Sequence, residues 1–205
     1  MQTNRNDFTA KFFQGIAVLH AISALLFAVV EVSQTNQHRI GPIGMMYPGP
    51  EHAYGVMRML AMLGIAALSM ACAFLWPGSA RASGWAEAVI AFGAGLIVSA
   101  LSVFVLYQYA CCDSPVFVLA GFPSSWLHIM TVAPRDPSTP IPYVLWEGVK
   151  RFSWHIDPGS AVVTVLFWVN AMWSSFVLGR MLWRVGLQRF SASMRPSESS
   201  KHART

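Results

Sequence analysis

The side chains best suited to redox or metal chemistry gather in one stretch, from Cys111 to Pro158. It begins with two adjacent cysteines, Cys111 and Cys112, followed by Asp113. A redox relay needs a thiol of low pKa and a resolving partner, and neighbouring cysteines depart from the usual Cα separation of about 5.5 Å in a disulfide. We interpret both as soft, partly buried thiols. A vicinal redox disulfide and a metal or intermolecular contact are the alternatives.

A metal site in this stretch would draw on Asp113, His128 and His155. A protein metal site needs three or four ligands, and the three cysteines of the chain form no CxxC pair. We therefore predict no metal site and no cofactor. The sequence also shows no Ser-His-Asp set, glycine-rich phosphate loop or paired carboxylates, so we expect no catalytic residues, without excluding an enzyme.

Polar side chains inside apolar segments form a second group of candidates, because a polar group in a membrane is costly. His20, Ser99 and Asn170 fall at similar depth on their segments. Such a cluster could bind a quinone carbonyl, relay a proton or tie helices together. We favour the structural tie. The full set of intramembrane polar candidates is His20, Glu31, Arg58, Ser99 and Asn170.

Glu31 and Arg58 lie near the ends of consecutive apolar segments, on the same side of the membrane. One hypothesis is that they pair and lock the two helices together. The alternative is that Arg58 extends alone to the interface while Glu31 is solvated. A third carboxylate, Glu87, is expected to face Arg81 or water.

The segment from Leu19 to Leu26 resembles the first-helix haem-ligand segment of bacterial cytochrome b561-type proteins, and His52 and Gly55 resemble a second feature of that family. The resemblance implies haem bound by two histidines at matching depth. The chain departs from the pattern, because Ala21 stands where a tryptophan follows the first histidine. No histidine lies inside the third or fourth apolar segment. Haem or quinone is thus an alternative only.

The composition indicates that membrane-spanning helices hold these residues in place. Of the 205 residues, 55% are hydrophobic and only 11% charged, whereas soluble domains carry about 25% charged residues. The basic excess concentrates in the tail, so we exclude nucleic acid as a partner. We predict a single all-α integral membrane domain, a four-helix transmembrane bundle. Its expected spans are 12–32, 54–76, 85–110 and 159–182, with a disordered basic tail at 186–205.

Small residues four apart predict how these helices pack, since close backbone approach drives association in lipid. Ala91, Gly95 and Ser99 form such a stripe on the third span, and Ala67 with Ala71 on the second. The first span carries alanines at 17, 21, 24 and 28. The alternative is that small residues are simply common in membrane helices.

Lysine and arginine counts near the span ends set the orientation. They place both termini in the cytoplasm and the loops 33–53 and 111–158 outside, in the periplasm of a bacterial inner membrane. Lys150 and Arg151 run against this assignment.

The outward loop 111–158 is too apolar for an ordinary loop. We expect a re-entrant or interfacial segment over 116–132, because Gly121 and Pro123 interrupt it. A surface helix is expected over 143–154, with Pro142 starting it. Asp157 is suited to cap the last span.

The Gly121-Phe122-Pro123 segment, followed by Asp157 and a last span, resembles a pattern of small uncharacterised bacterial four-span membrane proteins. Ser124 departs from it where an aromatic residue is expected. The resemblance implies an architecture and no activity.

These observations favour a non-catalytic accessory or assembly subunit that binds another membrane protein. A homo-oligomer is an alternative partner to a different protein, and the bilayer is a partner in either case. A quinone- or haem-associated redox subunit and a small transporter or lipid-handling protein are the alternative functions. The expected contact residues are Phe122, Trp126, His128, Trp154 and His155.

Overall fold

The computed structural model describes residues 2–38, 50–75, 85–110, 116–131, 141–151 and 153–193. Most of these residues are helical, and four helices are long and apolar enough to cross a membrane. The predicted four apolar helices are thereby confirmed. They are α1 (Gln2–His38), α2 (Pro50–Met70) continued by the π-helical η1 (Ala71–Leu75), α4 (Trp85–Leu101) continued by the 3-10 turn η2 (Ser102–Phe104), and α6 (Pro158–Ser193).

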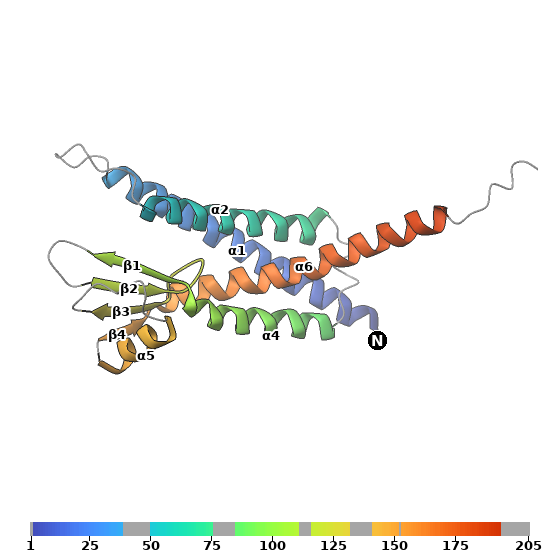
Figure 1. Ribbon diagram of the computed structural model, residues 1–205. Helices are drawn as coiled ribbons and strands as arrows, with labels where there is room; N and C mark the ends of the chain where they lie inside the picture. Colours follow the sequence, from blue (N-terminus) through green and yellow to red (C-terminus); the bar gives the residue numbers. More distant parts are fainter. Residues whose placement is uncertain are drawn as a thin grey trace, which may run out of the picture.

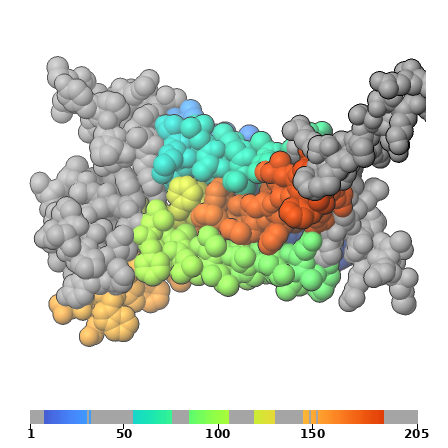
Figure 2. Space-filling view, turned by 45° about the vertical axis from the view of Figure 1, so that its right-hand side comes forward, coloured from blue at the N-terminus to red at the C-terminus, as the bar shows by residue number. Residues whose placement is uncertain are grey.

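Helix α6 is the centre of the bundle. It packs most extensively against α4 and also contacts α1 and α2, while α1 pairs with α2. Figure 2 shows α6 between α2 and α4 on one face of the molecule. Phe13 of α1 stacks on Trp173 of α6 with ring centroids 4.7 Å apart, and both side chains are fully buried. The aromatic pair joins the first helix to the last.

A four-stranded antiparallel sheet lies at one end of the bundle (Figure 1). The strands follow chain order across the sheet, and helix α5 (Ile141–Arg151) covers part of one face. Leu145 of α5 is buried with Leu127 and Ile129 of the sheet. We call the sheet and α5 together the cap. The strands are β1 (Leu106–Ala110), β2 (Val116–Ala120), β3 (Leu127–Thr131) and β4 (Trp154–Ile156).

The sheet corrects two predictions. The fold is not all-α, and the stretch 116–132 is wrongly predicted as a re-entrant or interfacial segment, because β2 and β3 pair there as a hairpin. The apolar runs on both sides of Gly121 and Pro123 are each the length of a short strand. The glycine and proline therefore mark a turn between strands, where we expected a break in a membrane segment.

Several predicted boundaries are also wrong. The third span was expected to reach residue 110, but helix ends at Phe104 and β1 follows. Residues 33–38, 50–53 and 186–193 are helical, although we expected loops and a disordered tail there. The surface helix is confirmed as a helix, α5, with Pro142 in its first turn. Cys111, Cys112 and Asp113 lie outside the described residues.

Candidate functional site

Residues 121–126 form a turn between β2 and β3 that is seated on the helix bundle. Gly121 has a φ of +123°, and an added Cβ would lie 2.5 Å from Cδ1 of Trp126. Both facts require glycine at this position. The peptide bond between Phe122 and Pro123 is cis. We call residues 121–126 the seated turn.

Side chains from two helices bind the carbonyl groups of the seated turn. Trp168 donates its indole N–H to the Phe122 carbonyl at 2.9 Å, and the Thr164 hydroxyl donates to the Ser124 carbonyl at 2.9 Å. Both residues belong to α6. Arg58 of α2 donates to the Pro123 carbonyl. Backbone carbonyls removed from water thus have donors, as burial requires.

Arg58 is therefore a positioning residue for the seated turn. Its guanidinium also lies 5.0 Å from the ring centroid of Phe27 on α1, a cation–π contact that links the first two helices. The side chain of Glu31 lies outside the described residues, so its pairing with Arg58 stays a prediction.

The five expected contact residues divide into two groups. Phe122 packs its ring against Phe167, with centroids 5.9 Å apart, and Trp126 donates its indole N–H to the Ser102 hydroxyl at 3.3 Å. These two rings face the bundle. Trp154 and His155 are exposed, and half-buried His128 lies beside His155. Trp154 and His155 are thus the exposed members of the five, whereas Phe122, Trp126 and His128 are half-buried.

His128 and His155 are brought together by the pairing of β3 with β4, where they lie directly opposite each other. Nδ1 of His128 is 3.1 Å from Nε2 of His155. The sequence identified both residues without predicting that they touch, since recognising the pair requires the strand register.

Asp157 caps α6, as predicted. Its carboxylate accepts the Gly159 N–H at 3.0 Å and the Ser160 hydroxyl at 2.7 Å. The hydrogen bond from Ser160 is the main cause that holds the pKa of Asp157 below its ordinary value, and the charge of His128 acts in the same direction.

The polar residues at mid-bundle are all buried. The Ser99 hydroxyl donates to the Gly95 carbonyl at 2.7 Å within α4, and its oxygen also lies 3.4 Å from the Thr164 carbonyl oxygen of α6. Asn170 donates to the Leu166 carbonyl at 2.8 Å within α6. Neither ring nitrogen of His20 has a hydrogen-bond partner among the described residues, and the ring packs at an angle against Phe167.

The small-residue stripe on α4 is buried against α6. Ala91, Gly95 and Ser99 are all buried. A Cβ on Gly95 would lie 2.7 Å from the Cα of Val169, so the two backbones are in close contact. The predicted packing role of this stripe is confirmed.

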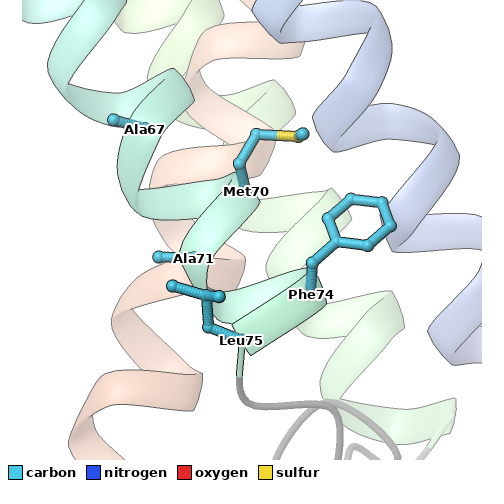
Figure 3. Close-up of a pocket in the computed structure, with 5 residues that line it drawn as sticks. All are labelled: Ala67, Met70, Ala71, Phe74 and Leu75. Atoms are coloured by element: carbon cyan, nitrogen blue, oxygen red, sulfur yellow. The ribbon is translucent and has the colours of Figure 1, made fainter.

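The stripe on α2 lies on the surface of the bundle, against our expectation. Ala67 is exposed and Ala71 half-buried. They line a shallow apolar pocket of about 310 Å³ together with Met70, Phe74 and Leu75. In Figure 3, the two alanines and Leu75 point to one side of the helix, and Met70 and Phe74 to the other. The π-helical turn η1 supplies three of these residues. We call this region the α2 surface pocket.

An ion pair between two helices was missed by the sequence analysis. Arg180 of α6 donates to the carboxylate of Glu87 on α4, at the end of the bundle far from the cap. Glu87 was expected to face Arg81 or water, and Arg81 lies outside the described residues. The sequence carried no signal for the pair, because it depends on the antiparallel packing of α4 and α6.

No family model, curated protein or solved structure matches the chain.

Proposed function

We propose that this protein is a non-catalytic accessory subunit that binds a transmembrane helix of another membrane protein at the α2 surface pocket. The observation that carries the proposal is the stripe of exposed Ala67 and half-buried Ala71, which lies on the outside of the bundle. In lipid, helices associate through close packing at small residues, since burial of apolar surface gives little drive.

The α2 surface pocket combines the features that such packing needs. Small side chains at 67 and 71 allow close approach of a second backbone, and Leu75 and Phe74, 73% and 48% exposed, can pack around it. Met70 adds a flexible side chain that adapts to a partner surface. All five lining side chains are apolar, which suits a helix within the bilayer and gives a soluble polar ligand no anchor.

The orientation with both termini in the cytoplasm belongs to the same proposal. It places the cap outside, so the partner would meet the α2 surface pocket within the membrane, close to its inner face. π-helical turns are rare and lie frequently at functional sites, and η1 supplies such a turn at this pocket.

The test is site-specific photo-crosslinking in native membranes. A photoreactive residue at Leu75 is expected to capture a transmembrane segment of a different integral membrane protein, identified by sequencing the crosslinked peptide. The same residue at Ile97, which is 62% exposed on α4, serves as the matched control and should give only lipid adducts.

Substitutions then test the role of the stripe itself. Ala67→Ile with Ala71→Ile should abolish the Leu75 crosslink, whereas Ala100→Ile, at an exposed alanine of α4, should leave it unchanged. Crosslinking of Leu75 to a second copy of this chain would replace the proposed partner with a homo-oligomer. Lipid adducts alone at Leu75 would overturn the proposal.

A further inference from the structure

Helix α5 carries a stripe of three exposed side chains along one side. Leu145 faces the sheet and is buried, whereas Trp146 is 68% exposed. Val149 and Lys150 are also exposed, and residues three and four apart share one side of a helix. Trp146, Val149 and Lys150 therefore form one surface that mixes an aromatic ring, an aliphatic side chain and a cation.

Strand β4 adds two apolar side chains to the same side of the cap. Trp154 lies opposite Ile129 in the sheet, and Ile156 lies opposite Leu127. Directly opposite residues of an antiparallel pair share one face of the sheet, and Ile129 and Leu127 are buried beneath α5. Trp154 and Ile156 are 47% and 49% exposed, because β4 is the edge strand. We call the combined surface the aromatic face: Trp146, Val149, Lys150, Trp154 and Ile156.

The aromatic face adjoins the part of α4 that is apolar enough to cross a membrane. Val103, in the turn η2 that ends α4, packs against the same buried cluster as Leu145 of α5. At this end of α4, Leu101 and Phe104 expose apolar side chains. Figure 1 shows α5 at the same end of the bundle. The exposed apolar surface of the span thus continues onto the cap.

The start of α6 sets the depth of β4 in the bilayer. The apolar span of α6 begins at Pro158. At about 3.3 Å per residue of strand, Ile156 lies within about 7 Å of that point and Trp154 within about 13 Å. The polar layer on each side of the hydrocarbon core is about 5–8 Å thick. β4 therefore lies at the level of the lipid headgroups, where tryptophan side chains gather.

We propose that the aromatic face binds the headgroup layer of the bilayer and prefers acidic phospholipids. Its rings and aliphatic side chains reach the boundary with the acyl chains, as in amphipathic helices that lie in the membrane interface. Arg151 is paired with Glu147 in the same helix. Lys150 has no ion-pair partner among the described residues, so its ammonium group can bind a lipid phosphate.

The aromatic face shares no residue with the α2 surface pocket. The pocket is proposed to bind a protein helix within the bilayer, whereas the aromatic face binds lipid at its surface. Either proposal can therefore fail without the other.

The test uses the purified full chain in vesicles of equal parts phosphatidylcholine and phosphatidylglycerol. A photoreactive residue at Val149 should form lipid adducts in which phosphatidylglycerol exceeds phosphatidylcholine about fivefold, the preference that one lysine near an acidic surface confers. Mass spectrometry of the adducts compares the two lipids. The same photoreactive residue at Ile97, exposed on α4, is the control and should capture both lipids equally.

Two charge variants assign the preference to one side chain. Lys150→Gln should bring the two lipids captured at Val149 close to equal amounts. Arg184→Gln, which removes an exposed cation from α6 far from the cap, should leave the preference unchanged.

Three results would overturn the proposal. The first is equal capture of both lipids at Val149 while Lys150 is intact. The second is an absence of lipid adducts at Val149. The third is capture of a second copy of the chain, which would assign the aromatic face to self-association.

Discussion

Helices α4 and α2 carry the same kind of small-residue stripe and use it in opposite ways. On α4 the stripe is buried against α6, where Gly95 approaches the backbone of Val169. On α2, Ala67 is exposed and Ala71 half-buried at the α2 surface pocket. The spacing of small residues thus sets where a helix can approach closely, while the neighbouring helices decide whether that place is filled.

The inward face of α2 explains why its stripe is left outside. Met62, Ala66 and Ser69 are buried, and Ser69 lies 3.2 Å from the hydroxyl of Ser174 on α6. These residues, three to four apart, occupy the side of α2 that faces the bundle. Ala67 and Ala71 are displaced around the helix from that side, so they cannot reach α6 at the same time.

The largest loss of stability is expected from enlarging a residue of the α4 stripe, which is already packed against α6. Gly95→Ala should destabilise the bundle by about 3 kcal/mol, because the new Cβ meets backbone atoms of Val169 that cannot rotate away. Thermal unfolding in detergent, followed by circular dichroism, measures the loss. Gly93→Ala is the matched control, since nothing lies within 4 Å of its Cβ position. Equal melting temperatures for the two variants would contradict the close approach of α4 and α6.

A smaller loss of stability is expected from removing the hydrogen bond by which α6 holds the seated turn. Thr164→Val keeps the side-chain volume but removes the donor to the Ser124 carbonyl, at a cost of about 2 kcal/mol for the buried group left unpaired. Ser175→Ala removes a hydroxyl that bonds only within the exposed side of the same helix, and should change stability little. Chemical unfolding of the parent protein and the two variants measures their free energies of unfolding. Equal losses of stability for both variants would show that the Thr164 hydroxyl does not hold the seated turn.

The ion pair between α4 and α6, at the end of the bundle far from the cap, should contribute less to stability than either of these contacts. Glu87→Arg or Arg180→Glu separately should lower stability by about 1 kcal/mol or less, because Glu87 is partly exposed and water screens the pair. The double variant, with the charges exchanged, should recover most of that loss. Melting temperatures at low and high salt give the measurement. A double variant as unstable as the sum of the single ones would show that the pair does not couple the helices.

The smallest effect is predicted for the α2 stripe. Ala67→Ile should change the free energy of unfolding by less than about 0.5 kcal/mol, since the side chain is exposed and no neighbour in the chain must move. The same detergent melts measure this. A loss as large as that of Gly95→Ala would show that the stripe packs within the chain, and the two helices would no longer differ.

The helices could be predicted from the sequence because apolar length alone specifies them. The end of the third span was misplaced, because residues 106–110 contain two tyrosines and a glutamine, are less apolar than the helix before them, and form a strand. Short apolar runs are compatible with both structures, and only their pairing distinguishes them. The hairpin signal was present at Gly121 and Pro123, and we interpreted it as an interruption.

The candidate sites show the same limit. Each of His128, His155, Arg58 and Thr164 can be found as a polar residue in an apolar context, but their partners lie between 27 and 65 residues away in the chain. Strand register and helix packing bring them together, and neither follows from local spacing. Asp157 was predicted correctly because its partners are two and three residues away.

The central position of α6 has a consequence for biogenesis. Ribosomes deliver α1 and α2 as a ready pair, but α4 has its main contact with a helix made more than fifty residues later. Until α6 inserts, the Gly95 face of α4 is open to lipid and the seated turn lacks its donors Thr164 and Trp168. Insertion of the last helix therefore completes the bundle and attaches the cap in one step. A chain truncated before α6 would present quality-control proteases with an unpaired helix and an unattached sheet.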